Sequence, residues 1–329
     1  MPTPKLLVTY EAGAASREII EDAAGTDLDV VYLDDVSKEH RCDALRSADA
    51  LLAMNTAKEL EAGEVELTAG AKLIQFVASG VDFVPLGDLP DNLTIASNGG
   101  AYAEPMAEHG VMMTLAAFKR LSVEQNKMRA GTFDQFESNR MLSGAVCGIL
   151  GFGGIGKATA RLMRAFGAKV HAINRSGATD EPVDWIGTDA DLSQLLEASD
   201  VLILSLPLTP ASERLIGKAE LAAMKSDAVL VNLARGEIID ETALYEHLKA
   251  NPDFWACIDA WWVEPIRHGR FEMAQDFLAL PNVVASPHNS ASVHGWRKVS
   301  LGRAVANVRR VLVEGEAPNF IVRPGDRMA

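Results

Sequence analysis

A glycine-rich turn between two apolar segments constrains the fold of this chain more than any other feature. From Val146 to Ser176 the sequence reads VCGILGFGGIGKATARLMRAFGAKVHAINRS, which predicts a strand, a turn, an amphipathic helix and a second strand. Gly151, Gly153 and Gly156 form G-x-G-x-x-G, which permits a tight turn, close approach of a pyrophosphate and close packing of helix on strand. A helix beginning near Ile155 would present unpaired N–H groups to the phosphates. The segment predicts a dinucleotide site, and the alternative is a purely structural turn.

Length, charge and cysteine content limit the classes of protein to which this chain can belong. A chain of 329 residues exceeds what one hydrophobic core usually serves, so about two domains are expected. The formal charge of -14 argues against a nucleic-acid or anionic-membrane partner, because both are bound through clustered Lys and Arg. Cys42, Cys147 and Cys257 are far apart in apolar settings, and no C-x-x-C or H-E-x-x-H pattern predicts a metal site. With no apolar signal segment and no run near the roughly 18 residues that span a bilayer, we expect a cytoplasmic protein.

Strand and helix patterns alternate along the chain, which is typical of parallel sheets covered by helices. The first hundred residues contain five short strand patterns: KLLVTY, LDVVYL, ADALLAM, KLIQFVA and LTIASN. A helical pattern from Ala103 to about Arg129 precedes the glycine turn, and DVLILSL, AVLVNLA, WACIDAW and NVVASPH predict further strands. The segment SLGRAVANVRRVLVEGE predicts a helix that ends at Gly315 and packs back on the N-terminal unit.

These patterns predict an α/β fold of two doubly wound parallel-sheet domains. A Rossmann-type NAD(P)-binding domain, residues 101–289, would be inserted into a flavodoxin-like substrate domain made of residues 1–100 and 290–329. We expect the substrate in the cleft between them.

Three downstream segments narrow the chemistry. NLARGEIID, DAWWVEP and SPHNSA place Arg235, Glu264 and His288 in an order and context that resemble the D-isomer-specific 2-hydroxyacid dehydrogenases, as do VASGVDFVPL and AYAEPMAEHG upstream. The resemblance covers nearly the full length. It implies an NAD(P)-dependent D-2-hydroxyacid dehydrogenase, similar to glyoxylate and hydroxypyruvate reductases, that transfers a hydride between NADPH or NADH and a small 2-keto acid.

The resemblance assigns the catalytic roles. The guanidinium of Arg235 would hold a carboxylate oxygen and the carbonyl oxygen of the substrate together. Because an imidazole can exchange a proton under physiological conditions, His288 would donate a proton to the forming alkoxide. Glu264 would bind its second ring nitrogen and favour the imidazolium. The other histidines are expected to be structural.

The resemblance also implies binding residues. Asp259 is similar to the aspartate that binds the nicotinamide carboxamide, with a helix or turn cap as the alternative. Backbone N–H groups of Ser79, Gly80 and Val81 would cradle the substrate carboxylate. Asn55 would bind the distal part of the substrate or cap a turn. The remaining expected cofactor contacts are Gly154, Ile155, Leu206, Pro207, Ser212, Leu233 and Ala234, together with Arg235 and His288.

Cofactor preference is predicted from the end of the second strand of the βαβ unit. An NAD enzyme normally has Asp or Glu there, which would repel a 2′-phosphate. This chain has Asn174, Arg175 and Ser176, so we expect NADP to be preferred, with NAD possible. The alternative is that Arg175 stacks on the adenine and selectivity is weak.

Two further features depend on comparison with the family. The segment IRHGRFEMAQDFLAL, which includes Arg267 to Leu280, is longer than usual and either shapes the pocket or is a surface loop. MAEHGVMMTLAAF predicts an apolar helix that needs burial on more than one side, which favours a homodimer.

A nucleotide-sensing, corepressor-like scaffold on the same fold is the alternative function. The retained Arg235, Glu264 and His288 favour the enzyme. The particular 2-keto acid, the strength of the NADP preference and the physiological direction are left open by the sequence.

Overall fold

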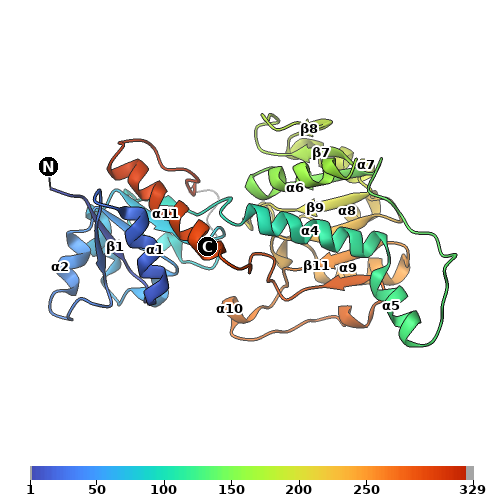
Figure 1. The fold of residues 1–329 in the computed structure, drawn as a ribbon, viewed down its shortest axis with the longest axis horizontal. Helices are drawn as coiled ribbons and strands as arrows, with labels where there is room; N and C mark the ends of the chain where they lie inside the picture. The colour runs from blue at the N-terminus through green and yellow to red at the C-terminus, as the bar shows by residue number, and fades with distance from the viewer. Residues whose placement is uncertain (1, 324–329) are drawn as a thin grey trace. The chain divides into compact units, whose positions relative to one another are not determined.

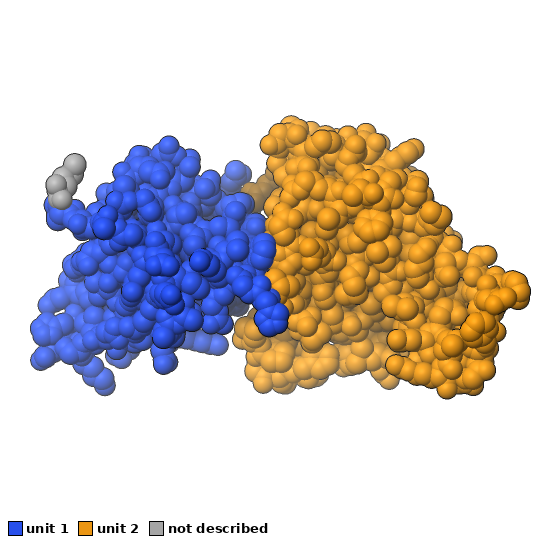
Figure 2. All heavy atoms as spheres, in the orientation of Figure 1, with its two compact units in different colours: residues 1–102, 294–329 blue, residues 103–293 orange. Residues whose placement is uncertain are grey.

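The chain divides into two compact units. In the computed structural model, unit 1 comprises Met1–Tyr102 and His294–Ala329, and unit 2 comprises Ala103–Val293 (Figure 2). The structure describes residues 2–323.

Unit 1 contains a five-stranded parallel sheet with the strand order β2-β1-β3-β4-β5, which is the order of the flavodoxin-like fold that the sequence analysis expects for this unit. The strands are β1 (Lys5–Val8), β2 (Asp29–Tyr32), β3 (Ala50–Ala53), β4 (Leu73–Phe76) and β5 (Thr94–Ala96). The helices are α1 (Ala14–Ala24), α2 (Arg41–Arg46), α3 (Thr56–Glu59) and α11 (Trp296–Leu312), with 3₁₀ turns η1 (Val65–Gly70) and η2 (Leu86–Asp88).

Helix α11 returns to unit 1 from the far end of the sequence. Its Leu301, Val305 and Val308 recur at helical spacing and are buried in one cluster with Ile20 of α1 and Leu6 of β1. This apolar face explains why the chain comes back to the first unit after completing the second.

Unit 2 contains a seven-stranded parallel sheet with the order β12-β11-β10-β9-β6-β7-β8. Its strands are β6 (Val146–Leu150), β7 (Lys169–Ile173), β8 (Trp185–Gly187), β9 (Val201–Leu204), β10 (Val229–Asn232), β11 (Trp255–Ile258) and β12 (Val283–Ala285). Its helices are α4 (Ala103–Phe118), α5 (Leu121–Arg129), α6 (Gly154–Ala165), α7 (Leu192–Ala198), α8 (Lys218–Ala223), α9 (Glu241–Ala250) and α10 (Pro265–His268), with 3₁₀ turns η3 (Asp189–Asp191), η4 (Gly236–Ile238) and η5 (Phe277–Ala279).

The order of this sheet is the Rossmann arrangement with a switch point between β6 and β9. Helices α4 and α6 lie side by side (Figure 1), because Ala103 and Ala107 of α4 let Ala158 of α6 approach closely. Because all strands are parallel, the residues that follow β6, β9, β10, β11 and β12 meet at one edge, the usual ligand-binding edge of such a sheet.

Two sequence-based boundaries were wrong. The helix expected from Ala103 to Arg129 is two helices, because Arg120 adopts the left-handed conformation (φ +50°), which a helix cannot continue through. The last helix runs from Trp296 to Leu312 and ends before Gly315. The strand β8 was not foreseen.

None of the helices in the described part of the chain is long and apolar enough to cross a membrane. Within residues 2–323 the structure also contains no group of three or more His, Cys, Asp or Glu side chains placed to hold a metal ion.

Candidate active site

The glycine turn between β6 and α6 is built for close approach of a ligand. Gly151 has φ +98°, and a Cβ there would lie 2.6 Å from the backbone nitrogen of Leu206. A Cβ on Gly156 would lie 2.6 Å from the carbonyl oxygen of Gly151. By contrast, a Cβ on Gly153 would meet nothing within 4 Å, and Gly153 caps α6 without any side-chain hydrogen bond. The turn therefore leaves open space in front of an uncapped helix N-terminus, which fits a pyrophosphate.

The loop after β9 is fastened to this turn. Ser205 Oγ donates to the carbonyl oxygen of Gly151 at 2.8 Å. Ser212 Oγ accepts from the Thr209 amide and donates to the carbonyl oxygen of Pro207, each at 2.8 Å. Ser212 therefore holds the turn that follows Pro207.

The loop after β7 is organised by Asn174. Its Oδ1 accepts from the amides of Ser176 (3.0 Å) and Gly177 (2.8 Å), and its Nδ2 donates to the Ala178 carbonyl at 2.8 Å. Ser176 Oγ lies 3.1 Å from the same Oδ1, and Arg175 between them is exposed. The side chain of Asn174 thus has a structural task in addition to the phosphate contact expected for it.

The two acids farther along this loop are engaged by α6. Asp180 pairs with Lys157, and Glu181 lies 3.1 Å from Arg161. The hydrogen bond from Lys157 lowers the pKa of Asp180. Both acids are thus bound to α6, and the residue just after β7, where an NAD enzyme normally has an acid, is followed by the exposed Arg175.

The turn after β10 presents Arg235. Asn232, the last residue of β10, donates from Nδ2 to the carbonyl oxygen of Arg235 (2.8 Å) and accepts at Oδ1 from the Ala234 amide (3.0 Å). Arg235 itself donates from Nη1 to the Ala234 carbonyl at 2.8 Å. Leu233 packs so closely on α4 that a Cβ on Gly110 would lie 2.8 Å from it. The buried Asn232 therefore fixes the turn on which Leu233, Ala234 and Arg235 lie.

At Gly236 this turn lies directly against the next loop. A Cβ on Gly236 would lie 2.3 Å from the carbonyl carbon of Trp261 and 2.4 Å from the nitrogen of Trp262. Only glycine allows the loop of Arg235 to lie directly against the loop that leads to Glu264.

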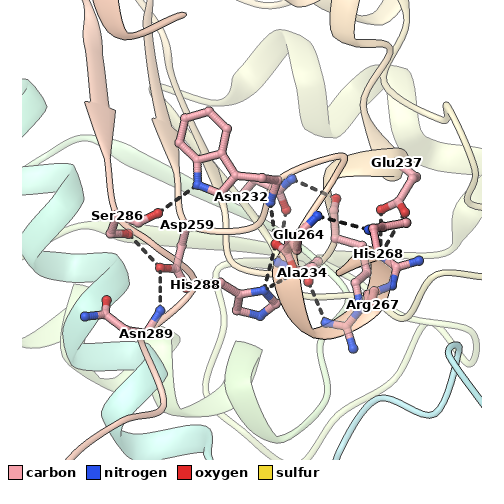
Figure 3. Close-up of polar contacts among 12 residues, drawn as sticks. Asn232, Ala234, Glu237, Asp259, Glu264, Arg267, His268, Ser286, His288 and Asn289 are labelled. Atoms are coloured by element: carbon pink, nitrogen blue, oxygen red, sulfur yellow. Dashed lines mark hydrogen bonds and ion pairs between the residues drawn. The ribbon is translucent and has the colours of Figure 1, made fainter. Parts of the chain in front are cut away.

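Glu264 and His288 form a close pair (Figure 3). Both carboxylate oxygens of Glu264 lie 2.8 Å from Nδ1 of His288, and Oε1 also accepts from the Trp261 amide at 2.7 Å. Burial favours a higher pKa for Glu264, but the bonds from His288 and Trp261 and the charges of His288 and Arg235 hold that pKa below its usual value. The Glu264 side chain is buried, whereas that of His288 is 32% exposed. The arrangement gives an ionised carboxylate that orients an accessible imidazole.

His288 also has an unusual backbone conformation. His288 has φ +49°, a conformation that non-glycine residues rarely adopt and that functional sites often contain.

Asp259 lies at the end of β11 in a buried polar cluster. Its Oδ1 accepts from Ser286 Oγ (2.6 Å) and from the Asn289 amide (3.2 Å), as Figure 3 shows. His109 of α4 lies with Nε2 3.0 Å from Ser286 Oγ. Because that hydroxyl donates to Asp259, it accepts from His109, and Nε2 of His109 carries the proton.

Two buried polar atoms in this region have no hydrogen-bond partner in the described part of the chain. They are Oδ2 of Asp259, an acceptor, and Oγ of Ser290, a hydroxyl two residues beyond His288. A carboxamide offers a donor for a carboxylate oxygen and an acceptor for a hydroxyl, so each of these atoms has the chemistry to bind the amide of a nicotinamide.

The candidate substrate residues of unit 1 follow β3 and β4. Ser79 Oγ donates to the Asn98 carbonyl at 2.8 Å. Among the hydrogen bonds of residues 2–323, none is donated by the backbone amides of Ser79, Gly80 or Val81. Asn55 accepts at Oδ1 from the Ala57 amide (3.2 Å) and caps α3, which was the alternative left open for it.

Several residues of the site were missed from the sequence. They are Asn232, Ser286, Ser290 and His109. Asn232 acts on residues two and three positions ahead, whereas Ser286 and His109 gain their roles through partners 27 and 177 positions away. The only local signal was the position of Asn232 at the end of an apolar strand.

Comparisons with known proteins show which family this chain resembles. A family model described as "D-isomer specific 2-hydroxyacid dehydrogenase, NAD binding domain" matches residues 111–290. A hydroxypyruvate reductase of Thermotoga maritima is 31% identical, over 74% of this chain and 78% of its own length. A glyoxylate reductase of Thermococcus litoralis is 28% identical over 85% of each chain. The crystal structure of a putative formate dehydrogenase from Pyrobaculum aerophilum, 26% identical, covers 98% of this chain and 100% of that one with a TM-score of 0.79.

Proposed function

Because the chain belongs to the D-isomer-specific 2-hydroxyacid dehydrogenase family and is an oxidoreductase acting on CH–OH donors, we propose that it reduces a small 2-keto acid with NADPH. The observation that carries this proposal is the Glu264–His288 pair beside the turn that presents Arg235. Two relatives are named hydroxypyruvate reductase and glyoxylate reductase, and these names support a small 2-keto acid as the substrate of this chain.

Arg235 is proposed to orient the substrate. Its planar guanidinium carries two parallel donors, which suit one carboxylate oxygen and the adjacent keto oxygen. Polarising the keto oxygen makes the keto carbon a better acceptor, and the same contact strengthens as negative charge develops on that oxygen. In unit 1, the backbone amides of Ser79, Gly80 and Val81 are the proposed donors to the substrate carboxylate, so unit 1 is the proposed substrate domain and unit 2 the proposed dinucleotide-binding domain.

His288 is proposed to give a proton to the alkoxide and, in the oxidation direction, to take it back. Glu264 accepts a hydrogen bond from Nδ1, which leaves Nε2 as the nitrogen available to the substrate. The carboxylate stabilises the imidazolium and fixes the plane of the ring.

The residues present fit a nicotinamide dinucleotide. The open space at Gly153 suits the pyrophosphate, and the orphaned Oδ2 of Asp259 and Oγ of Ser290 suit the carboxamide. When bound, the reduced nicotinamide supplies the hydride that reduces the keto carbon. The exposed Arg175 at the end of β7 supports a preference for NADPH over NADH, because a guanidinium pairs well with a 2′-phosphate.

A homodimer is proposed for the assembled enzyme. Apolar side chains of α4, α5 and α6, among them Met112, Leu115, Leu121 and Phe166, line an open groove on unit 2. Three of these, Met112, Leu121 and Phe166, are about half exposed. A second copy of the same face would cover them. Met112→Asp should raise the monomer fraction in sedimentation velocity, whereas Val313→Asp, at a similarly exposed site on unit 1, should not.

A cytoplasmic location is proposed from the cysteines. Cys42, Cys147 and Cys257 form no disulfide. Burial raises the pKa of the Cys147 and Cys257 thiols, which keeps them protonated and unreactive.

Arg235→Ala tests the function. We expect kcat/KM for a 2-keto acid to fall by more than about 100-fold while NADPH binding changes by less than about threefold. Arg214→Ala is the matched control, because Arg214 is also an arginine of unit 2 and pairs with Asp240 at the surface. A kcat/KM within about threefold of wild type, a loss under roughly 0.7 kcal/mol, would show that Arg235 does not orient the substrate.

A further inference from the structure

The segment that follows Glu264 folds back against the loop of Arg235. Arg267, in α10, places Nη1 2.7 Å and 3.0 Å from the two carboxylate oxygens of Glu237, as drawn in Figure 3. Glu237 lies in η4, two residues after Arg235. The pair is sheltered, with 14% of the Arg267 side chain and 23% of the Glu237 side chain exposed. It therefore joins the loop after β10 to the loop after β11 through charged groups that solvent screens only in part.

The Arg267 end of this ion pair is held to Glu264. Glu264 is the residue from which α10 begins, with Pro265 as the first residue of the helix. The amide of His268 donates to the Glu264 carbonyl at 2.7 Å, and the Glu264 amide donates to Nδ1 of His268 at 3.0 Å. These two bonds close a single turn around Arg267. The position of Arg267 consequently follows that of the carboxylate bound to His288.

The Glu237 end is held to Arg235. Arg235 is the residue from which η4 begins, and the amide of Ile238 donates back to its carbonyl oxygen at 3.4 Å. The adjacent Gly236 rests against the backbone of Trp261. The indole nitrogen of Trp262 also donates to the Ile239 carbonyl at 2.8 Å, so backbone and indole contacts already join the two loops. The Arg267–Glu237 pair adds an ion pair between them, two residues after Arg235 and three residues after Glu264.

We propose that Arg267 and Glu237 are positioning residues that fix Arg235 relative to the Glu264–His288 pair. This inference rests on the proposed function, since it takes Arg235 as the substrate-binding cation. Neither residue is placed on the reacting atoms. They act by holding the cation that orients the keto acid at a constant distance from the imidazole that protonates it, and misplacement by about 1 Å is enough to cost a large part of the rate.

Other contacts of the same segment support this view of it. Trp262 stacks on Phe277 with ring centroids 5.2 Å apart, and its indole nitrogen donates to the Ile239 carbonyl at 2.8 Å. The amide of Ala274 donates to Glu241 Oε1 at 2.8 Å. The segment therefore contacts the loop and helix that follow Arg235, while side chains such as Ile266 and Phe271 remain exposed.

The test compares kcat and KM in a double-mutant cycle. Arg267→Met, Glu237→Gln and the double variant are assayed for 2-keto acid reduction at saturating NADPH, together with Arg267→Lys. Arg270→Met is the matched control, because Arg270 also pairs with an acid on this segment, Glu272 at 2.7 Å, but both side chains are more than half exposed.

We expect Arg267→Met to lower kcat/KM about tenfold or more, chiefly through a higher KM for the keto acid. Glu237→Gln should cause a similar loss, the double variant should be no worse than either single variant, and Arg267→Lys should recover most of the activity. The Kd of NADPH and the alkaline limb of the pH profile should stay as in wild type, because the Glu264–His288 pair is intact. Arg270→Met should behave as wild type.

Three results would overturn the positioning role. They are a kcat/KM for Arg267→Met equal to that of Arg270→Met, additive losses in the double variant, or a lower Tm with unchanged kinetics at temperatures well below it. Arg235→Ala, assayed beside them, separates the two proposals. If Arg235→Ala is inactive while Arg267→Met is not impaired, only the positioning role is wrong. If Arg235→Ala remains active, the proposed function fails and the positioning role fails with it.

Discussion

Replacing Gly236 by alanine should separate the two loops that form the catalytic site. Gly236 directly follows Arg235, and its Cα faces the peptide that joins Trp261 to Trp262. An added Cβ would lie 2.3 Å, 2.4 Å and 2.6 Å from three backbone atoms of that peptide, and none of them belongs to a flexible side chain that could turn away. The loops must therefore move apart.

The size of the movement follows from the contact distances. Ordinary van der Waals contact begins at 3.4 Å, so the closest approach of 2.3 Å must open by about 1.1 Å (3.4 minus 2.3). A displacement of about 1 Å in a reacting geometry can cost about 100-fold in rate, which corresponds to roughly 2.7 kcal/mol. Overpacking should also destabilise unit 2 by about 1 to 3 kcal/mol.

The assay measures kcat/KM for a 2-keto acid, the Kd of NADPH and the Tm of Gly236→Ala. Gly302→Ala is the control, since a Cβ at Gly302 in the middle of α11 would meet nothing within 4 Å and should add up to about 1 kcal/mol of stability. We expect the loss of kcat/KM to exceed any loss of cofactor affinity. A folded Gly236→Ala protein with kcat/KM within about threefold of wild type would refute the argument that this contact sets the geometry.

Three further predictions concern single side chains. Glu264→Gln removes the charge that favours imidazolium, so the alkaline limb of kcat/KM for reduction should move down by about one pH unit or more; an unmoved limb in an active variant would contradict the pairing with His288. Because the pKa of Glu264 is lower in the folded protein than in the unfolded chain, ionised Glu264 contributes to the stability of the fold above its unfolded pKa. This contribution is lost as the pH falls through the folded pKa. The Tm difference between wild type and Glu264→Gln should therefore shrink only below about pH 4.5. Arg175→Ala should weaken NADPH binding about tenfold or more at fixed salt and leave NADH binding nearly unchanged, and an equal effect on both cofactors would indicate stacking on the adenine instead.

The fold was predictable because its determinants are local. The segment around Gly151 contains apolar strand patterns, a glycine-rich turn and an amphipathic helix pattern within a short stretch of sequence. The structure has the same strand, helix and strand there. Buried strands such as β9 and β10 are short, almost entirely apolar runs, so they can be predicted from the sequence without knowing which strands lie beside them. The break at Arg120 was not predictable, because no glycine or proline marks it and a left-handed arginine is set by its surroundings.

The polar details of the site were less accessible to sequence reasoning. Arg235, Glu264 and His288 were identified through their motifs, whereas their supports depend on tertiary contacts. Asn232 acts on the turn three residues ahead, but His109 reaches Ser286 across 177 positions of sequence. Likewise, the sequence does not show that the Asn174 side chain makes its hydrogen bonds within its own loop. Hydrogen-bond partners of this kind are fixed by packing, so they become visible only once the strands are in order.

The central claim is that this chain reduces a 2-keto acid with NADPH to the D-2-hydroxy acid. The most direct measurement follows NADPH oxidation with glyoxylate and hydroxypyruvate, repeats it with NADH, and determines the configuration of the product formed from hydroxypyruvate. We predict turnover of at least one of the two acids, a kcat/KM about tenfold or more higher with NADPH than with NADH, and the D-product. Absence of turnover with both cofactors, or an L-product, would contradict the claim, and a higher kcat/KM with NADH would contradict its cofactor part.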